Sequence, residues 1–245
     1  MRLDQAPGQS GVYEASGDCQ GRHDVPPPRN AEKVQQSIMQ AETKKSLIVV
    51  AVCIALTGGG FFGYQQIFTK GIDRLPAKPC AGAVDRSIVA DALPAARTAD
   101  ERGKITESVN NQFTFWCYVR TEDSTVSGEA KSGFATEEVW RQSYQGQRDG
   151  DPVSVSVGEV KAIGLENLAT VYVPCTPPQQ ADYKVERTHS PTANVRTIGE
   201  SRVQGVALRQ VLMDFAYQLT KHAYKIGKCK EARDFPDRLP RIQTD

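Results

Sequence analysis

One uninterrupted apolar stretch, residues 46–68, limits what this chain can fold into more than any other feature. Its sequence, SLIVVAVCIALTGGGFFGYQQIF, contains no acid and no base. About 22 residues at ~1.5 Å per residue give a helix of roughly 33 Å, enough to cross a hydrocarbon core of ~30 Å. The sequence therefore predicts a single transmembrane helix at 46–68.

We expect this stretch to be an uncleaved signal anchor. The apolar region of a secretory signal peptide has ~7–15 residues, whereas this stretch is longer and follows a lead of 45 residues. An Ala-Gly-Ala triplet at 81–83 has the form of a cleavage site. A cut there would remove Cys80 and leave an odd number of cysteines in the remaining domain.

Cysteine usage indicates on which side of the membrane the larger part lies. Lysines and arginines flank both ends of the stretch, so the positive-inside rule favours a cytoplasmic N-terminus by little. Four cysteines follow it: Cys80, Cys117, Cys175 and Cys229. Because disulfides persist outside the cytosol, we expect a cytoplasmic N-terminus and an extracytoplasmic C-terminal domain. Four reduced, buried thiols in a cytosolic domain are the alternative.

Composition divides the chain into five segments. The N-terminal part has few large apolar residues and includes the triple proline 26–28, so it cannot bury enough surface to order itself. The expected division is a largely disordered cytoplasmic tail at 1–45, the transmembrane helix at 46–68, a linker at 69–79, an extracytoplasmic α+β domain at 80–230 and a C-terminal tail at 231–245.

Hydrophobic periodicity after the linker predicts the α+β class. Residues 112–120 alternate apolar and polar side chains, as do residues 153–157, and residues 168–173 form a further strand. Asp85 is a candidate N-cap for a short helix that ends before Pro94. Residues 98–104 are expected to form a polar connection, and residues 125–131 a polar partner strand. Thr136 is expected to cap a short helix. Residues 176–200 are ambiguous, although Tyr183, Val185 and Val195 suggest one or two short strands.

The last element is a long amphipathic helix. Its apolar stripe has helical spacing and comprises Leu208, Val211, Leu212, Phe215, Leu219, Ala223 and Ile226. Ser201 and Gln204 have capping-box spacing, and Gly227 is a natural end. We expect this helix to lie across an antiparallel sheet, which the short N-terminal helix also packs, with Gln210 and Gln218 on its solvent side.

Four cysteines allow three disulfide pairings. We favour Cys80–Cys117 and Cys175–Cys229, since each pair would tie a helix end to a strand. The pairing of Cys117 with Cys175 and of Cys80 with Cys229 stays open.

A resemblance rests on the layout of this domain. Cys80 ahead of a short helix, the strand FTFWCYVR and the closing helix VALRQVLMDFAYQLTKHAYKIGKC together resemble membrane-anchored extracytoplasmic proteins of actinobacteria, many of them lipoprotein-like envelope proteins with disulfide-bonded α+β domains. The resemblance covers roughly residues 75–230. It implies a compartment and a fold, and it implies no reaction.

Three aromatic residues are the candidates for a ligand or partner surface. Trp116 and Tyr118 share a strand face opposite Cys117, and Trp140 lies on the predicted short helix. If no helix covers the face of Trp116 and Tyr118, that face is an exposed apolar patch and a binding site. If the last helix covers it, both residues belong to the core.

Within the apolar stretch, small residues recur every four positions at Ala51, Ala55, Gly59 and Gly63. Such spacing lets two membrane helices approach closely, so we expect self-association through this ladder. Ordinary glycine and alanine content of a membrane helix is the alternative.

The sequence contains no P-loop, GxSxG, HExxH or CxxC motif, and we expect no cofactor and no metal. A formal net charge of +1 offers no argument for a nucleic-acid partner. The expected function is a non-catalytic binding or sensing module of the cell envelope, with a wall component or another envelope protein as partner. An envelope hydrolase of unrecognised type and a structural subunit of a membrane complex are the alternatives.

Overall fold

A computed structural model describes residues 47–64, 66, 70–107, 112–146, 150–176 and 189–243 of the chain. The predicted tail at 1–45 lies outside the described residues, and so do Tyr183 and Val185. The chain divides into two units, residues 1–57 and 58–245, each of which is described by itself.

The apolar stretch forms a helix over Leu47–Tyr64, with a mean hydropathy of 2.1 and none of its residues buried. Its large side chains are all exposed, and Phe62 retains 73% of its accessible surface. The helix is therefore long and apolar enough to cross a membrane. In the described part of the chain it is the one helix with these properties.

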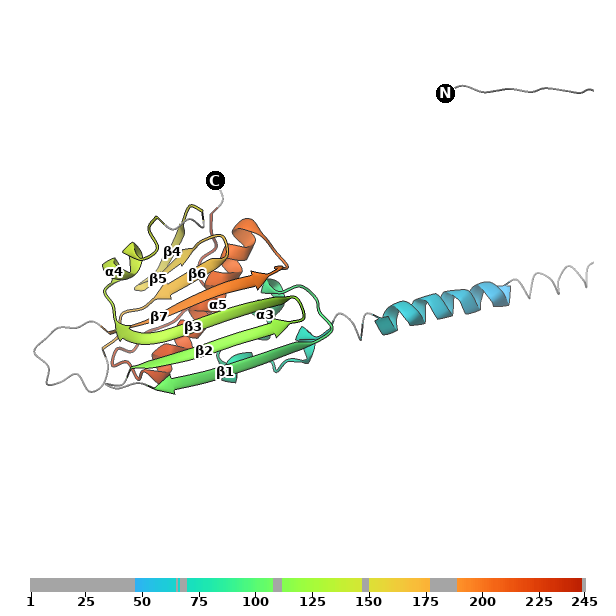
Figure 1. Cartoon of the computed structure of the whole chain (residues 1–245), viewed down its shortest axis with the longest axis horizontal. Helices are drawn as coiled ribbons and strands as arrows, with labels where there is room; N and C mark the ends of the chain where they lie inside the picture. Colours follow the sequence, from blue (N-terminus) through green and yellow to red (C-terminus); the bar gives the residue numbers. More distant parts are fainter. Residues whose placement is uncertain are drawn as a thin grey trace, which may run out of the picture. The chain divides into compact units, whose positions relative to one another are not determined.

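The C-terminal domain is α+β and contains a seven-stranded antiparallel sheet (Figure 1). The strands run in the order β1-β2-β3-β7-β6-β5-β4. Their bounds are β1 Ala99–Glu107, β2 Phe113–Thr121, β3 Ser124–Phe134, β4 Val153–Val157, β5 Val160–Gly164, β6 Leu168–Tyr172 and β7 His189–Gly199. The helices are η1 Ile72–Arg74, α2 Pro79–Gly82, α3 Arg86–Ala92, α4 Glu137–Gln142 and α5 Gly205–Ile226.

The long helix α5 lies across one face of the sheet, behind the strands in Figure 1. The alternation predicted for β2 is confirmed, because Phe113, Phe115, Cys117 and Val119 are all buried on this inner face. A Cβ atom on Gly128 of β3 would collide with Leu219 of α5, so a glycine is required where the helix crosses the strand.

The predicted polar connection at 98–104 is wrong, because residues 99–104 belong to the edge strand β1. A polar strand of this kind shows no apolar alternation, and it forms because each residue from Ala99 to Glu107 pairs with β2. Val195 lies in the central strand β7, which is 11 residues long rather than short. Strand β5 has no counterpart among the sequence predictions.

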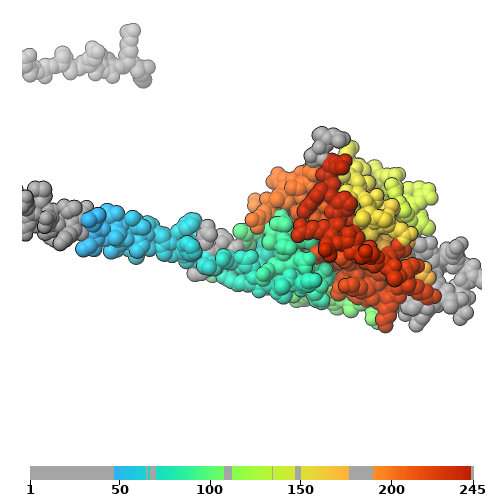
Figure 2. Space-filling model, turned by 180° about the vertical axis from the view of Figure 1, so that it is seen from behind, coloured from blue at the N-terminus to red at the C-terminus, as the bar shows by residue number. Residues whose placement is uncertain are grey.

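A further layer covers the opposite side of α5. Figure 2 shows the C-terminal segment after α5, in red, running over this face of the domain. Leu239 is 3% exposed, and the Tyr217 hydroxyl donates to the carbonyl of Pro236 at 2.6 Å. Gln210 is buried rather than solvated, and its side-chain oxygen accepts from the amide of Ile242. We call residues 231–243 the C-terminal strap, since they pack on the domain and are no separate tail.

The predicted linker at 69–79 also packs on the domain through Ile72 and Leu75, both buried. The short helix α3 begins after Asp85, as predicted, but the Asp85 carboxylate makes no cap. It accepts from Nε2 of Gln218 at 2.7 Å, while its amide donates to Oε1 of Gln218 at 2.6 Å. Two hydrogen bonds therefore join α3 to α5.

Helix caps give one confirmed and one wrong prediction. Thr136 caps α4, because its hydroxyl accepts from the amide of Val139 at 3.3 Å. The capping box at the start of α5 is absent: the N-cap is Gln204 without a side-chain cap, and Ser201 donates instead to the carbonyl of Val203.

The structure pairs Cys80 with Cys117 and Cys175 with Cys229, each with a Cα–Cα distance of 5.3 Å. These are the favoured pairs, and each ties a helix end to the sheet. The first pair holds α2 so close to β1 that a Cβ on Gly103 would strike the backbone of Cys80. Cys80 and Ala81 there adopt positive φ angles, and the Cys80 amide donates to Glu101 at 2.6 Å.

Candidate functional site

One face of the sheet points away from α5, and we call it the outer face. A helix covers this face over the strands at one end of the sheet and leaves it open over the strands at the other end. On the end formed by β1, β2 and β3, no described helix lies over the outward side chains. We call this end the open half. On the other end, formed by β4, β5 and β6, helix α4 packs over β5 and β6. We call this the covered half, and β7 separates the two.

Strand register places the outward side chains of the open half in rows across the sheet. One row contains Lys104, Trp116, Glu129 and Asn194, and the next contains Arg102, Tyr118, Ser127 and Arg196. Trp116 is 43% exposed, and Ile198 in a neighbouring row is 58% exposed. Trp116 and Tyr118 therefore lie on a face that no described helix covers, and their role as a ligand or partner surface stays a prediction.

Positive charge is concentrated on this surface. Together with the open-half end of β7, it carries five basic residues, Arg102, Lys104, Arg120, Lys131 and Arg196, and two acidic residues, Asp100 and Glu129. The formal excess of three positive charges exceeds the +1 of the whole chain. Lys131 neutralises Glu129 at 2.7 Å. Among the described residues, Lys104 and Arg196 have no ion-pair partner.

The aromatic rings and the cations of the open half are interleaved. The guanidinium of Arg102 lies 5.9 Å from the centroid of the Tyr118 ring. Such a contact is weak at an exposed site, but it holds the planar group beside the ring. The arrangement presents flat rings and hydrogen-bond donors on one surface, which suits an extended anionic ligand.

Trp140 does not belong to this surface, and its assignment as a surface candidate is wrong. The side chain is 5% exposed and packs with Ile163 and Tyr172 beneath α4. Its indole Nε1 donates to the hydroxyl of Thr170 at 2.9 Å. The apolar outward side chains of β5 and β6 need a cover, and Trp140 provides it. Helix α4 is only six residues long, so the spacing of its apolar residues does not show which of its sides packs against the sheet. Trp140 could therefore not be placed from the sequence.

A groove of about 540 Å³ lies on the inner side, between α3, α5 and the C-terminal strap. Five basic residues line it, Lys78, Lys221, Lys225, Arg238 and Arg241, together with four acidic ones, Asp85, Asp91, Asp214 and Asp237. Burial raises the pKa of Asp214, although Gln210 and Arg241 oppose this shift. Burial raises the pKa of Tyr217 to about 12, with Asp237 and Asp234 adding to the shift. The two signs of charge nearly balance, so the groove selects neither anions nor cations.

His222 lines the same groove without forming a catalytic pair. Its ring lies 4.7 Å from that of Phe115, and burial lowers its pKa. Within the described ranges His222 makes no hydrogen bond to a carboxylate, and no group of three His, Cys, Asp or Glu residues is placed to hold a metal. Ser190 is buried, and its hydroxyl donates to the carbonyl of Ala135.

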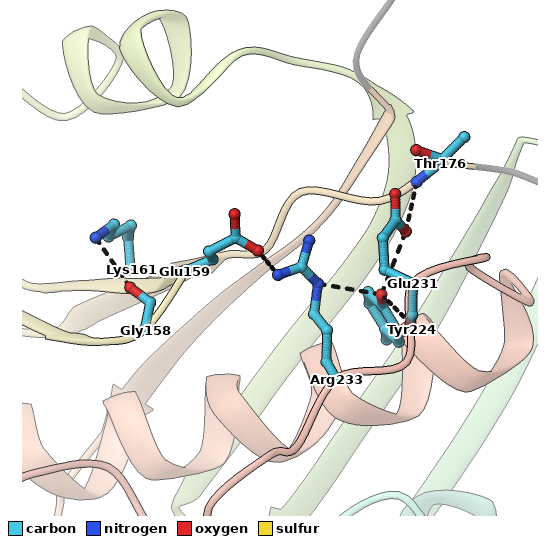
Figure 3. Close-up of polar contacts among 7 residues, drawn as sticks. All are labelled: Gly158, Glu159, Lys161, Thr176, Tyr224, Glu231 and Arg233. Carbon is cyan, nitrogen blue, oxygen red and sulfur yellow. Dashed lines mark hydrogen bonds and ion pairs between the residues drawn. The ribbon is translucent and has the colours of Figure 1, made fainter.

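A polar network fastens the C-terminal strap to α5, to the β4–β5 turn and to the chain after β6 (Figure 3). Arg233 forms an ion pair with Glu159 and donates through Nε to the Tyr224 hydroxyl at 3.1 Å. Tyr224 donates in turn to the carbonyl of Glu231 at 2.8 Å. The Glu231 carboxylate accepts from the amide of Thr176 at 2.9 Å.

Three groups of this network have shifted pKa values, and burial lowers the pKa of Arg233. Burial raises the pKa of Tyr224 to about 12, and Glu231 adds to the shift. Burial also acts to raise the pKa of Glu231, but the hydrogen bonds that its carboxylate accepts, those from Thr176 and Tyr224 among them, together outweigh burial and leave the pKa below its ordinary value. All partners are internal, so we interpret the network as structural.

The end of α5 and the residues after it carry five basic residues, Lys221, Lys225, Lys228, Lys230 and Arg233, and internal contacts occupy part of this basic cluster. Arg233 belongs to this network, and Lys221 donates to the carbonyl of Pro236 and lies 5.3 Å from the Tyr217 ring. The open half of the outer face is the more available basic surface.

The ladder residues Ala51, Ala55, Gly59 and Gly63 all lie in the apolar helix, at the spacing that places them on one side. Cβ atoms added at Gly59 and Gly63 would meet nothing within 4 Å. Self-association through this ladder stays a prediction.

No protein-family model, curated protein or solved structure matches this chain. The fold and the surfaces described above therefore carry the functional argument.

Proposed function

We propose that this protein is a single-pass membrane protein whose C-terminal α+β domain lies outside the cytoplasm and binds an anionic glycan of the envelope without catalysis. The unburied apolar helix Leu47–Tyr64 supports the membrane anchor. Two disulfides in the domain that follows support an oxidising compartment, because such bonds are rare in the cytosol. The short N-terminal part is then cytoplasmic.

The observation that carries the binding function is that the open half combines the exposed ring of Trp116 with cations that have no ion-pair partner among the described residues. Trp116 offers a flat apolar surface on which a sugar ring can stack, and Arg102 and Arg196 offer planar donors for carboxylate or phosphate oxygens. Antiparallel sheets commonly leave one face to water, but that face is usually polar. A half-exposed tryptophan among arginines is consistent with a ligand rather than with water alone.

The shape of the surface also supports an extended ligand. Four adjacent strands, β1, β2, β3 and β7, are ~4.8 Å apart, so each row of side chains spans roughly 14 Å. That span matches a short oligosaccharide segment lying across the strands. A flat surface of this kind offers little to a small compact ligand, which prefers a concave pocket.

The binding test uses the full chain in nanodiscs of neutral lipid. Hyaluronan serves as the anionic glycan, dextran of equal length as the neutral one, and vesicles containing phosphatidylserine as a lipid arm. We expect hyaluronan to bind, dextran to bind at least ~10-fold more weakly, and Trp116→Ala to weaken hyaluronan binding ~10-fold, which corresponds to ~1.4 kcal/mol. Added salt should weaken binding as well, because exposed charges are screened.

Val139→Ala is the matched control, since Val139 is 58% exposed on α4 and lies away from the open half. It should leave hyaluronan binding unchanged. Equal binding of dextran and hyaluronan, an unchanged affinity of Trp116→Ala, or a preference for the anionic vesicles would each refute the glycan proposal.

The compartment is tested separately by thiol labelling of intact cells with a membrane-impermeant reagent. We expect Cys80, Cys117, Cys175 and Cys229 to label only after reduction. If they stay shielded in intact cells and label after lysis without reduction, the domain is cytosolic.

A further inference from the structure

The two edges of the sheet differ in how they are protected against pairing with another strand. Strand β1 carries five charged residues within its nine: Asp100, Glu101, Arg102, Lys104 and Glu107. Charged side chains on an edge discourage a further strand from adding to it. Strand β4, with the sequence Val-Ser-Val-Ser-Val, carries no charge and no proline within its five residues, although Asp151 and Pro152 directly precede it. The β4 edge therefore lacks the protection that β1 has.

The outward backbone groups of β4 lack partners among the described residues. A two-residue turn, Gly158-Glu159, joins β4 to β5, and such a turn closes on a hydrogen-bonded pair, here Val157 and Val160. Hydrogen-bonded and non-hydrogen-bonded pairs alternate in an antiparallel ladder. The backbone groups of Val153, Val155 and Val157 therefore point to β5, and those of Ser154 and Ser156 point outward.

We propose that β4 is a homodimerisation edge, where two copies of this chain pair their β4 strands antiparallel about a two-fold axis at Val155. The sequence of β4 is the same in both directions. With Val155 on the axis, Ser154 faces Ser156 of the second copy, and Val153 faces Val157. Every outward backbone group of the two serines then finds a partner. The two sheets become continuous.

Burial and charge agree with this pairing. The three valines lie on the side of α5 and are each half-buried, so a second copy would extend the apolar layer that Val155 and Val157 already join. Asp151 would come near Glu159 of the second copy, and Glu159 already has Arg233 as its ion-pair partner. A pair of short edge strands is a small interface. Membrane anchoring, as proposed above, would raise the local concentration of copies.

The test introduces single cysteines into the full chain in membranes, in a background carrying Cys19→Ser and Cys53→Ser. In the proposed dimer the two Val155 residues form a non-hydrogen-bonded pair with Cα atoms ~4.5 Å apart, within the range that a disulfide bridges. Val155→Cys should therefore form a covalent dimer under mild oxidation. Ser154→Cys is the matched control, since its two copies would be ~8–9 Å apart, too far for a bridge.

We expect at least ~10-fold more covalent dimer from Val155→Cys than from Ser154→Cys, because of this difference in Cα separation. The double variant Ser154→Cys/Ser156→Cys should cross-link again. Adding Ser156→Lys to Val155→Cys should remove the cross-link, since lysine on an edge strand discourages pairing with another strand. Disulfide mapping checks that Cys80–Cys117 and Cys175–Cys229 are intact in each variant.

Two results would overturn the proposal: a monomeric Val155→Cys with both native disulfides intact, or equal cross-linking of Val155→Cys and Ser154→Cys. The same measurement in a Gly59→Leu/Gly63→Leu background distinguishes dimerisation through β4 from dimerisation through the small-residue ladder of the apolar helix. The cross-link should persist there, and its loss would assign association to the apolar helix instead. Glycan binding plays no part in these readouts, so the two proposals fail independently.

Discussion

The open and covered halves of the outer face belong to one sheet, yet they treat similar side chains differently. Each half has a tryptophan on the same side of the strands. Trp116 is 43% exposed among cations, whereas Trp140 is 5% exposed and bonded to Thr170. The difference follows from the strands beneath them. Outward residues of β6 include the large apolar Leu168 and Tyr172, and α4 covers this part of the sheet, while outward residues of β1 and β3 are polar and need no cover.

The comparison teaches that residue type does not separate core from binding surface in this domain. An aromatic residue over apolar neighbours completes a second small core, while the same residue among arginines and lysines remains available. Stability and binding should accordingly respond to different tryptophans.

The largest expected effect is a difference in the free energy of unfolding between variants of the two tryptophans. Trp140→Ala should lower the free energy of unfolding by roughly 3–5 kcal/mol, because it removes a buried ring and leaves a cavity. Trp116→Ala should lower it by less than ~0.5 kcal/mol. Guanidinium unfolding of the full chain in detergent micelles, followed by circular dichroism, measures both values. Similar losses for the two variants would contradict the division into halves.

Removal of each disulfide tests whether the two bridges stabilise the folded domain by equal amounts. Cys80–Cys117 fastens β2 in the open half, and Cys175–Cys229 fastens the chain after β6 in the covered half. The sequence separations are 37 and 54 residues. Loop entropy then gives a loss of roughly 4 kcal/mol for either paired Cys→Ser variant. Melting temperatures of the two variants should agree closely. A large difference would mean that one half depends on its bridge for more than loop entropy.

A smaller effect on the free energy of unfolding is expected at β7, the strand between the open and covered halves. The Tyr144 hydroxyl donates to Oδ1 of Asn194, which draws this outward residue of β7 toward the covered half. Tyr144→Phe should lower the free energy of unfolding by ~1 kcal/mol, the typical net value of one hydrogen bond. Hyaluronan binding to the same variant should be unchanged, and a loss of binding would place Asn194 in the ligand surface.

The smallest expected effect on the free energy of unfolding concerns Glu231 in the C-terminal strap and depends on pH. The pKa of Glu231 is lowered in the folded state, so its stabilising contribution is present above the unfolded value of about 4.5 and is lost as pH falls through the lower, folded pKa. Glu231→Gln should be less stable than the wild type at pH 7, with the difference vanishing at low pH. Unfolding midpoints between pH 7 and pH 2 measure this.

Glu138→Gln on exposed α4 is the matched control and should follow the wild type across this range. Asp214→Asn should change the slope in the opposite direction, because burial raises the pKa of Asp214 and its ionisation therefore opposes folding as pH rises. Identical slopes in Glu231→Gln and the wild type would contradict the role assigned to the Thr176 hydrogen bonds.

Local pattern was enough to predict several elements of the fold. The alternation of β2 and the stripe of α5 are strong because each element buries one side only, so burial leaves a period in the sequence. Thr136 was predictable as a cap because its hydroxyl bonds a backbone amide within its own turn. Strand β6 is buried on both sides, and β5 is nearly so, which leaves no such period. Strand β1 is polar and depends on β2 for its structure.

The candidate site was predictable in part. The shared face of Trp116 and Tyr118 follows from the period of a strand, but whether a helix covers that face depends on contacts far along the chain. Trp140 was misplaced because α4 is six residues long, too short for its pattern to show a preferred side. The cations of β1 join the surface through pairing of β1 with β2, and those of β7 through pairing with β3.

By itself, the sequence determined the features that depend on neighbouring residues: one helix apolar enough for a membrane, an α+β domain, the main strand and the amphipathic helix. The tertiary structure decided what depends on distant ones. It placed the C-terminal strap over α5, buried Trp140, left Trp116 exposed and made β4 an edge. The physical reason is that helical and strand periods act over a few residues, whereas burial of a given side chain depends on which distant segment packs against it.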